Sequence, residues 1–326
     1  LVAFDFAPGR FRRIVVTGSW DYGFEPREPP PIPAVFVKRE DGLKLLEIAE
    51  SGTRVEVEST VEIAEKRGLI LESVIPGSGE EGEVLLTAHH DHWLTGASDD
   101  LSGVAVLLSA ARELAARDLR HCVKIVSFTA EECGAPFSPW YWSHGSRVYA
   151  ERLEGELDRV IAVLNVDCAT RSPVSINASG LELQIPLCSL AERLGIEYER
   201  GLDHSYCDSY SFSRLGVPAA TVHSLPRILD VYHTDLDLVE SIDLETLERV
   251  SDLIVEASYR LARDGCRWLD YYGYALEIER RLARTDLADL ARDLLALVGE
   301  KIEAGDYARV RRAFRSITSS LVRPVF

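Results

Sequence analysis

The sequence predicts an α/β fold, a three-layer sandwich in which helices cover both faces of a mixed, mainly parallel central sheet. One observation behind this prediction is the alternation of strand-like and helix-like segments between residues 61 and 264. Another is that the strand-like segments are apolar along almost their whole length, as is typical of strands covered on both faces. The third is composition: of 326 residues, 46% are hydrophobic and 27% charged, which indicates a globular chain with one large domain and attachments.

Residues 1–60 precede this alternation, and we expect them to form a small accessory region. Its predicted elements are a strand at 13–17, an extended proline-rich stretch at 28–33, a strand at 34–37, a helix at 41–48 and a strand at 53–57. These elements offer too little apolar material for an independent core. The chain begins at Leu1 and contains no methionine, so we expect its natural N-terminus to lie upstream.

Residues 61–264 carry the alternating pattern of the main domain. Strands are predicted at 69–74, 83–89, 123–128, 160–166 and 218–223, and helices at 103–116, 142–152, 186–194 and 244–262. The first helix is expected to bury one stripe, formed by Val104, Leu107, Leu108 and Ala111. Because the carboxyl ends of parallel strands meet at one edge of a sheet, a functional site is expected there.

Residues 265–326 read as a helical extension. Leucines recur at helical spacing after the Thr285–Asp286 cap, at Leu287, Leu290, Leu294 and Leu297. Such a stripe usually packs on its own domain. Contact with another subunit is the alternative, which would make the protein a homo-oligomer through its C-terminal helices.

Bulk properties exclude several classes of partner. The net charge of −17 comes without any basic stripe, so a nucleic-acid partner is not expected. No apolar run approaches the roughly 20 residues that span a bilayer, so no membrane association is expected. The six cysteines lack C-x-x-C pairs, which favours free thiols in a reducing compartment and therefore a cytoplasmic location.

Metal-compatible side chains follow the second predicted strand. His89 and Asp91 leave the same face of its end, while His90 points to the other face. Two adjacent acids, Asp99 and Asp100, come next. Imidazole and carboxylate groups that converge at a strand end suit a divalent cation such as zinc. This stretch therefore predicts one half of a metal site.

Later strand ends supply the other half. Glu131 and Glu132 follow the third strand, and two adjacent like charges make sense if one binds metal and the other handles a proton. Asp167 ends the fourth strand, and His233 follows the fifth. Each crossover thus places a metal-compatible group at the same edge of the sheet.

Five motifs in this order resemble the co-catalytic di-zinc aminopeptidase family, which includes bacterial leucyl aminopeptidases, glutamate carboxypeptidase and glutaminyl cyclases. They are Ala88–Asp91, Ser98–Gly103, Ala130–Gly134, Asn165–Asp167 and Tyr232–His233. The resemblance covers roughly residues 68–262 and implies a zinc-peptidase type of sandwich. Cys207–Pro218 is similar to a weaker family segment. Residues 32–59 look like the tail of a protease-associated domain, which would make 1–60 a truncated version of it.

The resemblance implies a metal-ligand set. His89 and Asp167 would hold one zinc, Glu132 and His233 the other, and Asp99 would bridge them. By chemistry alone Asp99 and Asp100 are interchangeable, as are Glu131 and Glu132, and only the family order separates them.

The remaining roles also come from the resemblance. Glu131 would be the general base, and Tyr232 would donate a hydrogen bond to the oxyanion of the tetrahedral intermediate. Asp91 would fix the tautomer of His89, and Asp100 would shape the loop next to the bridge. Asp208 would order the site or touch the substrate amine. Cys133, Cys207 and the aromatic run Trp140–Trp142 are candidates for the pocket wall.

The implied function is a metallo-aminopeptidase that hydrolyses N-terminal residues from peptides with a free N-terminus. It would use two Zn²⁺ per chain, for which Co²⁺ or Mn²⁺ can substitute. Three alternatives stay open: a glutaminyl cyclase-like acyltransferase with one zinc, a carboxypeptidase, and a receptor-like member without catalysis. A carboxypeptidase needs cations for the terminal carboxylate, and Arg147, Arg171 and Arg227 are available. A non-catalytic member typically lacks ligands, whereas all five are present here.

Overall fold

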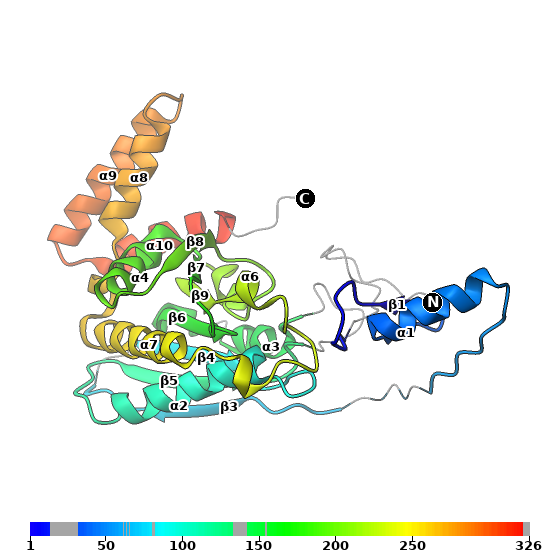
Figure 1. Cartoon of the computed structure of the whole chain (residues 1–326). Coiled ribbons are helices and arrows are strands. Elements are labelled where there is room, and N and C mark those ends of the chain that lie inside the picture. The colour runs from blue at the N-terminus through cyan, green and yellow to red at the C-terminus, as the bar shows by residue number, and fades with distance from the viewer. Residues whose placement is uncertain are drawn as a thin grey trace.

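The computed structural model describes residues 1–13, 32–60, 62, 64, 66–79, 82–132, 142–153 and 155–321. Its centre is a seven-stranded sheet with the strand order β3-β5-β4-β6-β9-β7-β8 (Figure 1). The strands are β3 Leu71–Ile75, β4 Glu83–His89, β5 Cys122–Phe128, β6 Val160–Asp167, β7 Val174–Ala178, β8 Tyr198–Leu202 and β9 Ala219–His223. The pairs β3–β5 and β7–β9 are antiparallel and the other pairs are parallel. The predicted mixed, mainly parallel sheet is therefore confirmed.

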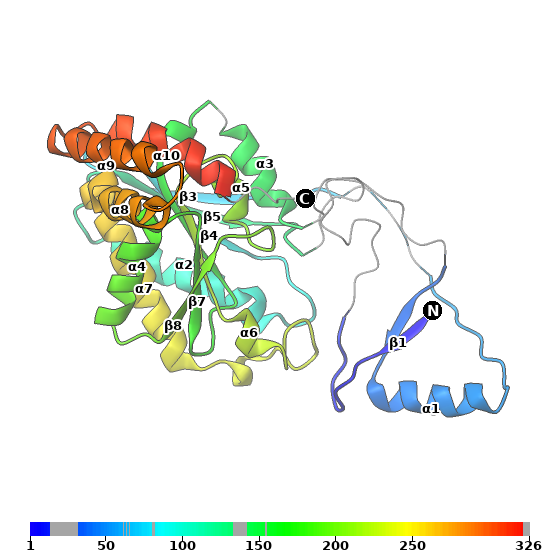
Figure 2. The same cartoon turned by 90° about the horizontal axis from the view of Figure 1, so that it is seen from above.

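Helices cover both faces of the sheet (Figure 2). The helices of the sandwich are α2 Ser102–Leu114, α3 His144–Arg152, α4 Leu181–Arg193, α5 Tyr210–Ser213, α6 Leu225–Ile228 and α7 Leu244–Asp264. Side chains alternate along β4: Val84 and Leu86 join the core under α2, α4 and α7, while Leu85 joins a second core with residues of α3 and α5. Burial of both faces explains why the central strands are apolar along most of their length.

Three sequence-based expectations about these elements are wrong. The buried stripe of α2 is Val106, Leu107, Ala110 and Leu114, whereas Leu108 is 68% exposed. The strands β7 and β8 were not predicted, because serine, asparagine and charged residues interrupt them. The strand expected at 53–57 is absent, since this alternating stretch has no strand to pair with and remains exposed.

The N-terminal region forms a small lobe beside the sandwich (Figures 1 and 2). In it, β1 Val2–Phe4 pairs in parallel with β2 Val35–Val37, and α1 Arg39–Glu50 follows. Gly42 of α1 lies against the ring of Phe4, where a larger residue would clash. Most of the strand expected at 13–17 and of the proline-rich stretch lies outside the described residues. The boundaries predicted at residues 60 and 264 stay predictions.

The C-terminal region is helical, as expected, with α8 Tyr271–Leu282, α9 Ala288–Glu303 and α10 Tyr307–Leu321. The pair α8–α9 stands away from the sandwich in Figure 1. The predicted leucine stripe is buried only in part: Leu287, Leu290 and Leu297 are exposed and Leu294 is partly buried against the core, while Ala291 and Val298 are buried. Among the described residues, no helix combines the length and the apolar character that crossing a bilayer requires.

Candidate metal centre

Two groups of possible metal ligands meet at the carboxyl edge of the sheet, and they share Asp99. One group is His89, Asp99 and Asp167, and the other is Asp99, Glu132 and His233; within each, the candidate ligand atoms lie within 4.8 Å of one another. His89 Nε2 is 3.2 Å from Asp99 Oδ1. His233 Nε2 is 3.0 Å from Asp99 Oδ2 and 2.8 Å from Glu132 Oε1. These are the five residues singled out in the sequence.

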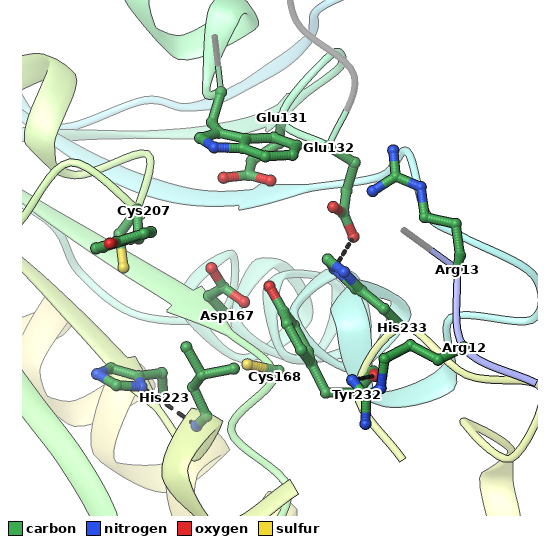
Figure 3. A pocket seen from close by; sticks show the side chains of 13 residues that line it. Arg12, Arg13, Glu131, Glu132, Asp167, Cys168, Cys207, His223, Tyr232 and His233 are labelled. Atoms are coloured by element: carbon green, nitrogen blue, oxygen red, sulfur yellow. Dashed lines mark hydrogen bonds and ion pairs between the residues drawn. The ribbon is translucent and has the colours of Figure 1, made fainter. Parts of the chain in front are cut away.

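The elements explain this convergence. His89 is the last residue of β4 and Asp167 the last of β6, so the sheet itself fixes both. Asp99 lies in the short helical segment η1 Ala97–Leu101 between β4 and α2, Glu132 lies in the loop after β5, and His233 lies beyond α6. In Figure 3 the side chains of Glu132 and His233 point toward one another, and the phenol of Tyr232 points into the same space.

The cluster buries three carboxylates against two imidazoles. His233 Nε2 lies within ion-pair distance of Asp99 Oδ2 and of Glu132 Oε1, and all three atoms are buried. Burial raises the pKa of Glu132 to about 7 and raises the pKa of Asp167 as well. Burial lowers the pKa of His233, but hydrogen bonds to Asp99 and Glu132 outweigh it and bring this pKa to about 9. Carboxylates and imidazoles packed in this way suit a bound cation.

Glu131 is buried but belongs to neither group. Its Oε1 accepts a hydrogen bond of 3.0 Å from the Ser143 hydroxyl. Burial, together with neighbouring acids that include Asp208 and Glu132, holds its pKa well above the ordinary value. A carboxyl that is next to the ligand groups and not part of them is placed to handle protons.

Asp91 acts through different atoms from those predicted. Its main-chain carbonyl oxygen lies 2.8 Å from His89 Nδ1, whereas its carboxylate is 3.9 Å away. The carboxylate instead accepts the main-chain N–H groups of Glu131 and Glu132, both at 3.1 Å. Asp91 therefore stays the candidate that sets the His89 tautomer, through its main-chain carbonyl and not through its carboxylate.

The loop that carries Asp99 is held by two other buried acids. Asp100 Oδ1 accepts the N–H groups of Gly103 and Cys168, both at 3.0 Å, so it shapes the loop as expected. Asp237 Oδ1 accepts the Ser98 N–H at 2.7 Å, and its Oδ2 accepts the Asp99 N–H at 3.1 Å. Sequence reasoning missed Asp237, although it stands only four residues after His233.

A cavity of about 460 Å³ opens beside the ligand groups (Figure 3). Its lining includes Glu131, Glu132, Asp167 and His233, and it also includes Trp142, Cys168, Tyr206, Cys207, His223, Leu225 and Tyr232. Of the expected wall residues, Cys207 and Trp142 line it, whereas Cys133, Trp140 and Tyr141 lie outside the described residues. The ring of Tyr232 stacks on that of His233, with ring centroids 3.7 Å apart.

Several other candidates lie away from the cavity. Asp208 is buried and does not line it, which favours ordering of the site over contact with a substrate amine. Arg147 donates to His144, Arg171 to Asp230, and Arg227 to Glu199. None of these three arginines lines the cavity, and the arginines that do are Arg12 and Arg13 of the N-terminal region, which sequence reasoning had not considered.

Comparison with known proteins places this site in a family. The model of peptidase family M28 matches residues 72–258, more than half of the chain and close to the range of the sequence resemblance. The chain belongs to peptidase family M28. Aminopeptidase YwaD of Bacillus subtilis is 25% identical over 244 residues, which are 71% of this chain and 52% of YwaD. The chain thus spans about half the length of this curated relative.

Solved structures agree on the fold. BSAP, a zinc aminopeptidase from Bacillus subtilis, matches with a TM-score of 0.59 and 22% identity, over 80% of this chain and 63% of BSAP. A glutaminyl cyclase from an Acidobacteriales bacterium matches with a TM-score of 0.53 and 21% identity, over 60% of this chain and 74% of the cyclase. The M28 sandwich therefore occurs in proteins named for either reaction, and the fold alone does not choose between them.

Proposed function

We propose that this M28 protein is a zinc-dependent aminopeptidase that removes N-terminal residues from peptides. The observation that carries the proposal is the pair of ligand groups that share Asp99, with a separate buried carboxyl, Glu131, beside them. Such a pair suits two cations, which polarise a scissile carbonyl and acidify a water when bound.

His89, Asp99 and Asp167 would hold one zinc, and Asp99, Glu132 and His233 the other. The donor set supports zinc, because imidazole nitrogen and carboxylate oxygen are both among its usual ligands. Cobalt or manganese can substitute in sites of this kind. The excess of buried carboxylates over imidazoles, with Asp99 shared by both groups, supports the fit to a cation.

Glu131 and Tyr232 would act on the substrate. Glu131, with its raised pKa, takes a proton from the attacking water and gives it to the nitrogen of the leaving amine. Burial and nearby acids keep the pKa of the Tyr232 phenol well above its ordinary value, so the hydroxyl stays protonated and donates to the oxyanion. The carboxylates around the cavity favour a substrate ammonium group.

The cavity wall suggests which N-terminal residues are preferred. Trp142, Tyr206, Leu225 and the buried thiols of Cys168 and Cys207 give it a largely apolar surface. Burial raises the pKa of both thiols well above the ordinary value, so they stay neutral. Large apolar or aromatic side chains fit this surface, whereas acidic side chains would meet Glu131 and Asp167.

The other expectations stay predictions: a cytoplasmic location, no nucleic-acid or membrane partner, and self-association through the C-terminal helices. Carboxypeptidase activity stays an alternative: Arg147, Arg171 and Arg227 are engaged elsewhere, but Arg12 and Arg13 line the cavity and could meet a terminal carboxylate. A glutaminyl cyclase would contain one zinc and cyclise an N-terminal glutamine. A receptor-like member without catalysis would bind no zinc or leave all substrates intact.

The test combines metal content with a panel of chromogenic aminoacyl substrates, with and without a chelator. We expect about two zinc ions per chain and the fastest hydrolysis with leucine or phenylalanine derivatives. Glu131→Gln should lower kcat by roughly 10²- to 10⁴-fold while zinc content is unchanged. Glu113→Gln, on the exposed side of α2, is the matched control. Full activity of Glu131→Gln would show that the mechanism is wrong, and one zinc with cyclisation would favour the cyclase.

A further inference from the structure

We propose that residues 5–13, called here the N-terminal arm, complete the metal centre, and that Asp5 and Arg12 are positioning residues for the segment with Tyr232 and His233. For the reaction, this rests on the function proposed above. For the geometry, it rests only on contacts between described residues, within the arm and between the arm and a segment more than 200 positions away in the chain.

The arm is organised around the buried carboxylate of Asp5. Arg10 binds it through two hydrogen bonds, of 2.9 and 3.0 Å, and Arg12 Nε adds a third at 3.2 Å. Burial alone would raise the pKa of Asp5, but the hydrogen bonds, that from Arg10 first, bring it to about 2. One carboxylate thus fixes the orientation of two guanidinium groups.

Other N–H groups of the two arginines donate hydrogen bonds to main-chain carbonyls in the segment that leads to His233. Arg12 Nη1 donates to the carbonyl of Tyr232 at 2.6 Å, and Arg12 Nη2 to that of Leu229 at 2.7 Å. Arg10 Nη1 donates to the carbonyl of Asp230 at 2.5 Å. The planar fork of Arg12 therefore holds two points of one loop at a fixed separation, which a single charge cannot do.

Main-chain bonds continue the contact beyond His233. The N–H of Arg13 donates to the carbonyl of His233 at 2.8 Å, and the N–H of Asp235 donates to that of Phe11 at 3.0 Å. Arg12 and Thr234 form an antiparallel bridge. His233 has a φ of +57°, a left-handed conformation that persists only where the surroundings hold it. In this loop the arm is a large part of those surroundings.

The arm contacts affect only the half of the metal centre that contains Glu132 and His233. His89 and Asp167 end sheet strands and need no further support. The imidazole of His233, by contrast, reaches Asp99 and Glu132 from a loop held by the arm, and it carries the stacked ring of Tyr232 with it. Loss of the arm contacts should therefore weaken the zinc on Glu132 and His233 and spare the one on His89 and Asp167.

The experiment measures zinc affinity site by site, by chelator competition, in the full chain. We expect Arg12→Gln and Asp5→Asn to keep one tight zinc and to bind the second roughly 10- to 100-fold more weakly. With zinc in excess, kcat should fall more than KM rises. Arg12→Lys should not restore the second site, because lysine lacks the planar fork. The matched control is Arg311→Gln, since Arg311 of α10 likewise donates to main-chain carbonyls, those of Leu157 and Asp158.

The outcomes separate the two proposals. Wild-type affinity at both sites in Arg12→Gln and Asp5→Asn would overturn the role of the arm. Equal weakening of both sites, or the same loss in Arg311→Gln, would also overturn it, because it would indicate a general defect in folding. If the wild-type chain binds two zinc ions but cleaves no peptide, the proposed function fails, while the zinc affinities of the arm variants still decide the role of the arm.

Discussion

The buried carboxylate of Asp237 tests how the main chain of Asp99, the ligand shared by both groups, is kept in position. Its two oxygens accept the main-chain N–H groups of Ser98 and Asp99, at 2.7 and 3.1 Å, and the residue is 1% exposed. Asp237→Asn keeps the size of the side chain. It leaves one acceptor oxygen and turns an NH₂ group toward the second N–H, which then has no acceptor there.

The size of the effect follows from the bonds that are lost. A hydrogen bond to a charged group contributes roughly 1.5–3 kcal/mol, and an unsatisfied buried N–H costs about 1–3 kcal/mol. We expect a local loss of about 2 kcal/mol in the loop that orients Asp99. Because Asp99 belongs to both ligand groups, both zinc affinities should fall, each by about 30-fold at 1.4 kcal/mol per factor of ten.

The assay is competition for zinc with a chromogenic chelator, alongside urea unfolding of the metal-free protein. Asp270→Asn is the matched control, because Asp270 Oδ1 accepts the N–H of Gly273 at 2.7 Å at the start of α8, outside the metal centre. We expect the control to lose stability and keep its zinc affinity. Unchanged zinc affinity in Asp237→Asn would refute the reasoning, as would an equal loss in the control.

Two further predictions concern protons. Burial raises the pKa of Glu182 to about 7 from 4.5, so the folded chain binds the extra proton between these pH values and stability falls as pH rises through that window. Relative to wild type, Glu182→Gln should be equally stable near pH 4.5 and about 3 kcal/mol more stable at pH 8 by urea unfolding; a constant difference at both pH values would contradict this. The hydrogen bond that His89 donates to Asp99 likewise holds the pKa of His89 well above its ordinary value despite burial, and the pKa of His233 is about 9. Zinc binds neutral imidazole, so filling the His233 site at pH 7.5 should release protons, measurable by calorimetry in buffers of different ionisation enthalpy; no release would rule this out.

The sheet and the ligand cluster could be predicted because their signals are local. A central strand is covered on both faces, so β4, β5 and β6 are apolar along most of their length and stand out in the sequence. A polar residue directly after such a run must lie at the carboxyl edge of the sheet. His89 and Asp167 follow this rule, and the structure places both in the first ligand group.

Elements at the margins of the fold lack such a signal. The edge strand β8 has one side toward solvent, and β7 includes Asn177, whose amide contacts His204 and His223 instead of an apolar core. The helical stripes were misread for a related reason. The buried side of α9 is the side that packs on α8. Because this pair of helices stands away from the sandwich, leucines such as Leu290 stay exposed (Figure 1).

The loop-borne members of the site share a kind of support that no sequence pattern reveals. Each is held through its main chain by a distant charged side chain: Glu132 by Asp91, Asp99 by Asp237, and the His233 segment by Arg12. Main-chain N–H and carbonyl groups occur at nearly every residue, so the partner of such a side chain leaves no mark in the sequence.

The difference between ligands at strand ends and ligands on loops has a chemical consequence for the candidate metal centre. The ligand side chains supply charge and donor atoms, and a sheet can hold two of them rigidly, but the groups on loops need anchors to reach the same precision. Removing an anchor such as Arg12 leaves every ligand in the chain and changes only where His233 lies. The defect should then appear as lost zinc affinity at one site with normal zinc chemistry at the other, a pattern that loss of a shared ligand such as Asp99 would not produce.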